Sequence, residues 1–75
     1  MVNETVQTLT IAGTDSGGGA GVMADIKTMQ MRHVFSAAVI VAVTAQNTIG
    51  VQDFMPIPKK LIDEQFASVA DDLKI

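Results

Sequence analysis

The chain has 75 residues, of which 48% are hydrophobic and 17% are charged, and its formal net charge at pH 7 is -3. This negative balance gives no electrostatic reason to expect nucleic acid or an anionic membrane as a partner. The absence of cysteine excludes a disulfide framework and a cysteine-ligated zinc site.

The first predicted elements are a strand, a glycine-rich loop and a helix. Thr8–Ala12 is short, β-branched and apolar, which predicts a buried strand. Gly13–Gly21 follows with five glycines in nine positions, which predicts a turn that other groups can approach closely. An amphipathic helix is predicted next, because four residues recur at steps of 4, 3 and 4 along one stripe: Val22, Ile26, Met29 and His33.

The rest of the chain predicts further strands and a second helix. Phe35–Ala45 contains seven consecutive apolar residues, as in a central strand of a parallel sheet that is covered on both faces. Val51–Ile57 alternates and carries a proline, so an edge or irregular strand is predicted there. Between Lys59 and Leu73 apolar residues again recur at helical spacing: Ile62, Phe66, Val69 and Leu73. This order of elements predicts an α/β fold.

Composition and pattern also predict that the chain is part of a larger domain. A domain of this length is only marginally stable alone, and so apolar a composition is typical of the interior of a larger enzyme. Another strand is expected after Ile75, because a sheet of two or three parallel strands cannot cover its own faces. We therefore expect residues 1–75 to be the amino-terminal fragment of a single domain, truncated before the next strand and inactive alone.

The sequence predicts a location in the cytoplasm. Met1–Gln7 has neither the basic start nor the apolar core of an export signal. The longest apolar run, Ala37–Val43, is far shorter than the roughly 20 residues that span a bilayer. No association with a membrane is expected.

The glycine loop alone permits several interpretations. A glycine-rich turn before a helix gathers backbone N–H groups that suit an anion or polar ligand, but it can also be a tight turn without a ligand. Gly19–Ala24 satisfies the G-x-G-x-x-A dinucleotide pattern, although its first glycine lies seven residues past Ala12. In addition, Val39–Gln46 lacks the acid that would hold a ribose. A non-catalytic dinucleotide- or phosphate-binding module is therefore an alternative.

Two blocks of sequence resemble a known family. LTIAGTDSGGGAGVMADIKTMQ at Leu9–Gln30 and VTAQNTIGVQ at Val43–Gln52 resemble the start of the hydroxymethylpyrimidine/phosphomethylpyrimidine kinases, members of the ribokinase-like superfamily. The resemblance implies a three-layer fold with a mainly parallel sheet. It implies phosphorylation of 4-amino-5-hydroxymethyl-2-methylpyrimidine and its monophosphate, in thiamin biosynthesis, with ATP and Mg²⁺. It also implies a homodimer.

The same resemblance implies where the sites lie. The ATP site and the catalytic base would lie in the carboxy-terminal half of such a kinase, so no catalytic or metal-binding residue is expected in this chain. The related pyridoxal kinases share the glycine loop and are an alternative, but they tend to carry a methionine-containing sequence where Gln46–Asn47 stands here.

By resemblance, the aminopyrimidine site draws on Gly13, Asp25 and Gln46, with the backbone of Thr44 and the loop around Ala20. The chemistry of Gln46 fits independently, because a primary amide complements a ring nitrogen beside an amino group, as when glutamine reads adenine. It also follows a predicted buried strand, where open α/β sheets bind their ligands.

Two other polar residues have more than one possible role. Asp15 is either a ligand or a turn residue that accepts hydrogen bonds from its own loop. His33 is expected to be a helix-end residue rather than a ligand. It replaces a glycine of the family pattern, so the turn after the helix is expected to differ locally.

Overall fold

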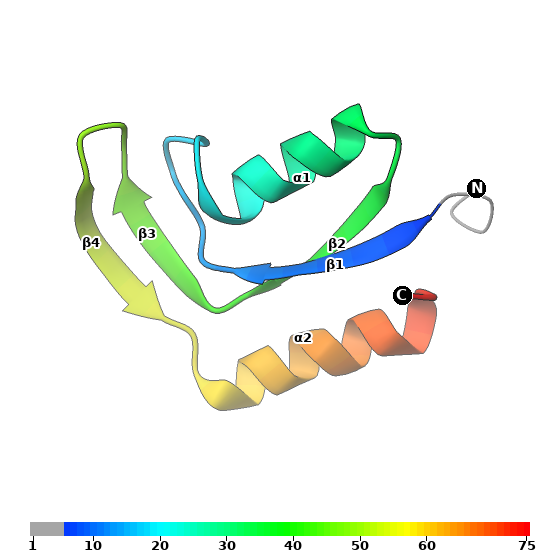
Figure 1. Cartoon of the computed structure of the whole chain (residues 1–75). Helices are drawn as coiled ribbons and strands as arrows, with labels where there is room; N and C mark the ends of the chain where they lie inside the picture. Colours follow the sequence, from blue (N-terminus) through cyan, green and yellow to red (C-terminus); the bar gives the residue numbers. More distant parts are fainter. Residues whose placement is uncertain (1–5) are drawn as a thin grey trace.

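The computed structural model describes residues 6–75, which form an α/β fold (Figure 1). The elements, in chain order, are β1 (Gln7–Ala12), α1 (Gly21–Met31), β2 (Phe35–Ile40), β3 (Ala42–Gln46), β4 (Val51–Pro56) and α2 (Lys59–Asp72). The predicted helices and edge strand are confirmed, but α1 ends at Met31, so His33 of its predicted stripe lies beyond the helix. The prediction that no export signal is present concerns Met1–Gln7, most of which lies outside the described residues.

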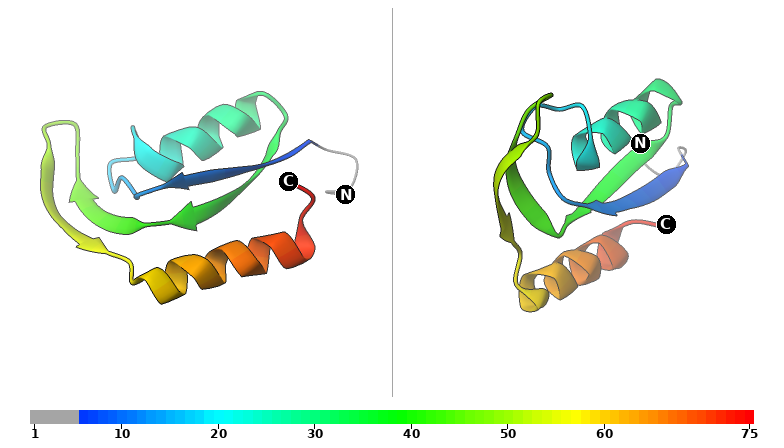
Figure 2. Two further views of the ribbon diagram at one scale, coloured as in Figure 1. Left: turned by 60° about the horizontal axis from the view of Figure 1, so that its bottom comes forward. Right: turned by 60° about the vertical axis from the view of Figure 1, so that its left-hand side comes forward.

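A pair of parallel strands forms the centre of the fold. β1 and β2 pair in parallel, from Gln7 opposite Phe35 to Ala12 opposite Ile40. α1 contacts both strands and α2 contacts β2, and the helices lie on opposite sides of the pair (Figures 1 and 2). Val39 of β2 is therefore completely buried. The three layers and the parallel pairing agree with the predicted architecture.

The predicted single strand Phe35–Ala45 is wrong in one respect, because the structure divides it at Val41. Up to that point β2 follows β1, and the N–H of Val41 still donates to the carbonyl of Ala12 (3.1 Å). Beyond Ala12 the chain enters the glycine loop, so β3 loses its parallel partner. It pairs instead with β4 in an antiparallel hairpin with an irregularity between Ala45 and Gln46. The described strands thus form one parallel and one antiparallel pair.

The end of α1 keeps the geometry of a glycine-terminated helix without a glycine. The N–H of Val34 donates to the carbonyl of Met29 (2.9 Å), and that of His33 to Gln30 (3.1 Å). This double pattern requires a left-handed residue after the helix, and His33 adopts φ of 59°. The assignment of His33 as a helix-end residue is confirmed. The expected local difference is not seen in these hydrogen bonds, because left-handed His33 permits the same bonds that a glycine would.

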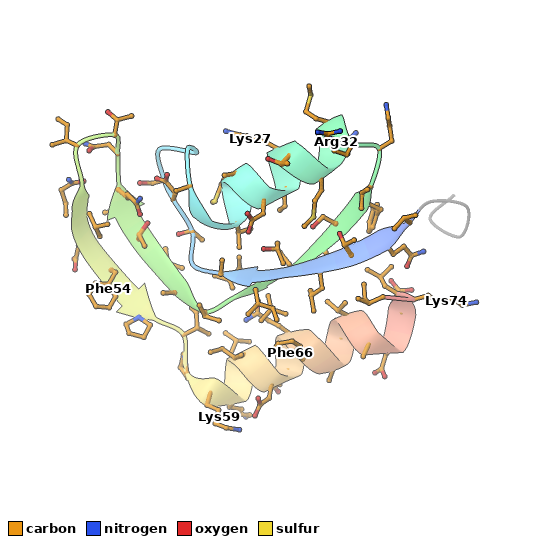
Figure 3. The ribbon with its side chains drawn as sticks, in the orientation of Figure 1. Lys27, Arg32, Phe54, Lys59, Phe66 and Lys74 are labelled. Carbon is orange, nitrogen blue, oxygen red and sulfur yellow. The ribbon has the colours of Figure 1, made fainter. Side chains whose placement is uncertain are left out.

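α2 covers the other side of the parallel pair with its predicted apolar stripe. Phe66 lies on the side of α2 toward the strands, whereas Lys59 projects away from them (Figure 3). The side-chain amide of Gln65 binds both the N–H and the carbonyl of Ile40, each at 2.8 Å. Among residues 6–75, no helix is both long and apolar enough to cross a membrane.

Candidate functional site

The glycine loop between β1 and α1 is folded around the carboxylate of Asp15. Asp15 is only 5% exposed. Its two oxygens accept hydrogen bonds from the backbone N–H groups of Gly17 (2.7 Å) and Gly19 (3.0 Å). This is the loop-turn role considered for Asp15, and it is confirmed. A negative charge of the protein itself therefore occupies these loop amides.

The first part of the loop lies along β3 and is joined to it by side-chain hydroxyls. Thr14 Oγ1 accepts a hydrogen bond from the N–H of Thr44 (2.9 Å), and the Thr44 hydroxyl donates to the carbonyl of Thr14 (2.6 Å). Two residues further, Ser16 Oγ accepts from the N–H of Gln46 (2.6 Å) and donates to the carbonyl of Gln46 (2.5 Å). Together with the backbone bond from the N–H of Thr14 to the carbonyl of Ala42 (2.9 Å), these bonds hold the loop against β3.

The last residue of the loop is Gly21, which starts α1. It has φ of +60°, and a Cβ at this position would lie 2.5 Å from the carbonyl oxygen of Gly13. That oxygen accepts a hydrogen bond from the N–H of Val22 (2.9 Å). Gly13 and Gly21 thus bring the two ends of the loop together, which a side chain at position 21 would prevent.

A hollow of about 260 Å³ lies between the glycine loop and the segment that follows β3. It is at the carboxyl ends of β1 and β3, where α/β folds commonly bind ligands. Two of the five predicted substrate residues, Ala20 and Gln46, line it together. The lining residues are Asp15, Gly17, Gly19, Ala20, Gln46, Asn47 and Thr48.

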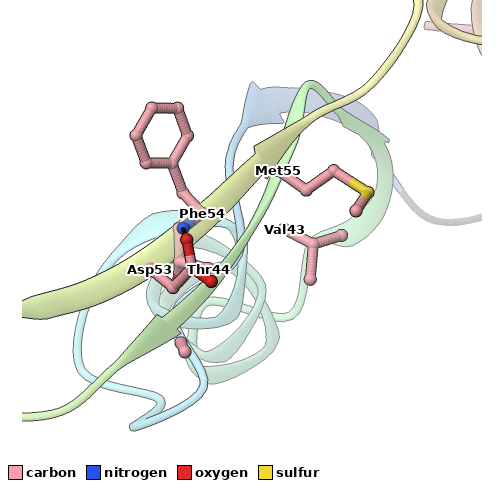
Figure 4. Close-up of a pocket in the computed structure, with 6 residues that line it drawn as sticks. Val43, Thr44, Asp53, Phe54 and Met55 are labelled. Atoms are coloured by element: carbon pink, nitrogen blue, oxygen red, sulfur yellow. Dashed lines mark hydrogen bonds between the residues drawn. The ribbon is translucent and has the colours of Figure 1, made fainter.

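The other three predicted substrate residues do not line this hollow. The carbonyl of Gly13 accepts the hydrogen bond from Val22 described above. Asp25 is half-buried on α1, and its Oδ2 accepts a hydrogen bond from the hydroxyl of Thr10 (2.5 Å). Thr44 lines a separate hollow of about 240 Å³ on the β3–β4 hairpin, where Phe54 stands beside it (Figure 4). The ligand roles of these three residues stay predictions.

Sequence reasoning did not single out Thr14 and Ser16. A signal was present, because hydroxyl residues at alternate positions of an extended segment project to the same side. The strand that these hydroxyls contact could not be deduced, since β3 was expected to continue β2 rather than turn toward the loop.

Residues 6–75 contain no group of three His, Cys, Asp or Glu side chains that could hold a metal ion. The amides of Gly17 and Gly19 would be needed to cradle a phosphate, but they already donate to Asp15.

Comparison with known proteins shows the family of the chain. Residues 15–75 match the model of the phosphomethylpyrimidine kinase family. A hydroxymethylpyrimidine/phosphomethylpyrimidine kinase of Haemophilus influenzae is 61% identical over 69 residues, which are 92% of this chain and 26% of that relative. The chain thus spans about a quarter of the length of this relative.

Solved structures show the same relationship. The crystal structure of phosphomethylpyrimidine kinase from Clostridium difficile 630 superposes with a TM-score of 0.88 at 46% identity, over 92% of this chain and 30% of that one. Pyridoxal kinase of Bacillus subtilis, solved as an ADP complex, gives a TM-score of 0.82 at 33% identity, over 95% of this chain and 28% of that one. These neighbours are ribokinase-like kinases. The chain belongs to the phosphomethylpyrimidine kinase family.

Proposed function

We propose that this chain is the amino-terminal part of a kinase that phosphorylates 4-amino-5-hydroxymethyl-2-methylpyrimidine and then its monophosphate, in thiamin biosynthesis. In this proposal the chain forms much of the pyrimidine site, and the remainder of the complete kinase supplies the catalytic base. The strongest support is the hollow in which Gln46 meets the glycine loop.

The amide of Gln46 suits the edge of an aminopyrimidine. Its Oε1 lies 3.3 Å from the hydroxyl of Thr44, whose hydrogen is already donated to Thr14 over a shorter distance, 2.6 Å. Within residues 6–75, no hydrogen bond involves the Nε2 of Gln46. The amide therefore retains a donor for the ring nitrogen of the substrate and an acceptor for its amino group.

The two alternatives are less well supported. A pyridoxal kinase is a structural neighbour, but at 33% identity against 46% for the phosphomethylpyrimidine kinase. A dinucleotide or phosphate site would place an anion at the glycine loop, where the carboxylate of Asp15 already binds the amides of Gly17 and Gly19. An anion bound at the loop would lie close to the Asp15 carboxylate, and the repulsion between the two negative charges disfavours this alternative.

Several further properties belong to the proposal. ATP is the expected phosphoryl donor, and the ADP bound to the Bacillus subtilis pyridoxal kinase supports this. We expect Mg²⁺ to be required and to be bound outside this chain. A homodimeric complete kinase in the cytoplasm stays a prediction.

The test is an assay of the complete protein with MgATP and each candidate acceptor, with products identified by ³¹P NMR. We expect a phosphate monoester from hydroxymethylpyrimidine, a diphosphate from its monophosphate, and slower turnover of pyridoxal. Turnover of pyridoxal alone would replace the proposal by the pyridoxal kinase alternative. Calorimetric titration with NAD or NADP should give no specific heat, and micromolar binding would favour the dinucleotide module.

A further inference from the structure

We infer that Ser16 is a positioning residue of the pyrimidine site, which holds Gln46 at a fixed distance from the glycine loop. The inference rests on the proposed function only for its consequence in catalysis. Its structural basis is that one hydroxyl binds both backbone groups of Gln46, at 2.6 and 2.5 Å. Ser16 itself does not line the hollow, so it acts through Gln46 rather than on the substrate.

The local backbone shows why a hydroxyl is needed at this position. Gln46 ends β3 at the irregularity of the hairpin, where regular pairing with β4 shifts. There the backbone N–H and carbonyl of Gln46 are bound by Ser16. A hydroxyl can donate and accept at once, which alanine in the same place cannot do.

The close approach of the loop to β3 supports the same conclusion. A Cβ on Gly17, the residue after Ser16, would lie 3.1 Å from Cα of Asn47 and 3.3 Å from the carbonyl oxygen of Gln46. The loop is therefore packed tightly against the strand end where Ser16 binds it. The carboxylate of Asp15 accepts hydrogen bonds from the N–H groups of Gly17 and Gly19, and so it organises the part of the loop that lines the hollow.

Together, these contacts connect the two walls of the hollow. Asp15 shapes the wall that contains Ala20, and Ser16 joins that wall to the wall that contains Gln46. Losing the Ser16 hydroxyl should leave the Gln46 side chain intact while freeing its backbone to move. The expected effect is weaker binding of the pyrimidine, with the ATP site unaffected.

The experiment compares Ser16→Ala, Ser16→Thr and the control Ser36→Ala in the complete kinase. Ser36 lies on β2, and its hydroxyl donates to the carbonyl of its neighbour Ala37. The control substitution therefore removes a serine hydroxyl that is away from the hollow. For Ser16→Ala we expect KM for hydroxymethylpyrimidine to rise about tenfold, the effect of losing one to two net hydrogen bonds. KM for ATP should change by less than about twofold. Ser16→Thr should restore the wild-type KM.

A second measurement does not depend on the substrate. Amide hydrogen exchange followed by NMR should show the N–H of Gln46 exchanging at least about tenfold faster in Ser16→Ala than in wild type or Ser16→Thr. The N–H of Ile57, bonded to the carbonyl of Val41 at 2.9 Å and not among the residues that line the hollow, serves as the internal reference. Unchanged exchange at Gln46 overturns the positioning role, whatever the substrate proves to be. Faster exchange without phosphorylation of hydroxymethylpyrimidine by wild type would uphold the role of Ser16 and refute the proposed function.

Discussion

The hydroxyl of Thr10 donates a hydrogen bond of 2.5 Å to Oδ2 of Asp25, and this contact joins β1 to α1 across their interface. Thr10 is 6% exposed and Asp25 is half-buried, so both groups are largely removed from water. A carboxylate in such a place needs a donor. The structure therefore gives Asp25 a stabilising role, in addition to the substrate role that the family resemblance implies.

Thr10→Val in the complete kinase should lower the free energy of unfolding by about 1–3 kcal/mol, because it leaves the Asp25 carboxylate without its donor at nearly unchanged side-chain volume. Urea unfolding measures the loss. Thr8→Val is the matched control on the same strand. The Thr8 hydroxyl lies 3.1 Å from the sulfur of Met29 and 3.3 Å from the carbonyl of Phe35, which are both uncharged acceptors, so the loss there should be smaller. Equal losses in the two variants would show that the carboxylate does not depend on Thr10.

Gly21→Ala should disrupt the start of α1. The left-handed conformation alone costs a non-glycine residue about 1–2 kcal/mol, and the contact of 2.5 Å with the Gly13 carbonyl adds to this cost. The melting temperature of the complete kinase should fall clearly. Gly50→Ala is the control, because a Cβ at Gly50 would have no atom within 4 Å. A Gly21→Ala variant as stable as Gly50→Ala would contradict this geometry.

His33→Gly should stabilise the complete kinase. His33 adopts φ of 59° at the end of α1, and glycine takes this conformation without strain. The expected gain in the free energy of unfolding is about 0.5–1 kcal/mol, after the greater freedom of glycine in the unfolded chain is subtracted. Gln30→Gly, on the exposed side of the preceding turn, should instead lose about 1 kcal/mol. A loss at His33 as well would show that its side chain stabilises the helix end.

Features set by residues close together in the chain could be predicted from the sequence, whereas features set by distant residues could not. The stripes Val22–His33 and Ile62–Leu73 predicted both helices, because the period of a helix is local. The last residue of each stripe nevertheless lies just beyond its helix. The break at Val41 could not be predicted, since it follows from where β1 ends, about thirty residues earlier in the chain. For the same reason Gln46 could be proposed as a substrate residue from its chemistry and its flanking sequence, whereas its partner Ser16 could not.

The isolated 75-residue chain should not fold cooperatively and should not turn over ATP. Among the described residues, Val22 and Val39 are the hydrophobic residues counted as buried, while Phe54 and Met55 are 63% and 69% exposed. So small a core cannot offset the conformational entropy of the chain. Calorimetry of the monomeric peptide should show no cooperative transition, and a dye specific for apolar surface should bind. A sharp transition or measurable turnover would contradict this expectation.

Gln46→Met in the complete kinase should switch the relative specificity toward pyridoxal. The substitution removes the amide that lines the hollow and leaves the polar edge of the pyrimidine desolvated and unpaired. An unpaired buried polar group costs about 1–3 kcal/mol, which corresponds to a loss of about 5- to 150-fold in kcat/KM for hydroxymethylpyrimidine. Pyridoxal does not present the same edge, so its kcat/KM should fall less or rise.

Gln52→Met is the matched control for this switch. Gln52 lies on β4, and its Nε2 donates to the carbonyl of Gly50 at 2.9 Å, away from the residues that line the hollow. Gln52→Met removes an amide of the same kind without altering the predicted pyrimidine contact. The kcat/KM values for hydroxymethylpyrimidine and for pyridoxal should therefore both stay close to wild type. Melting temperatures should be similar in the two variants, because half-buried Gln46 at the end of β3 contributes little packing. If Gln46→Met lowers kcat/KM equally for both substrates at unchanged stability, Gln46 does not recognise the pyrimidine edge and the assignment of the site is wrong.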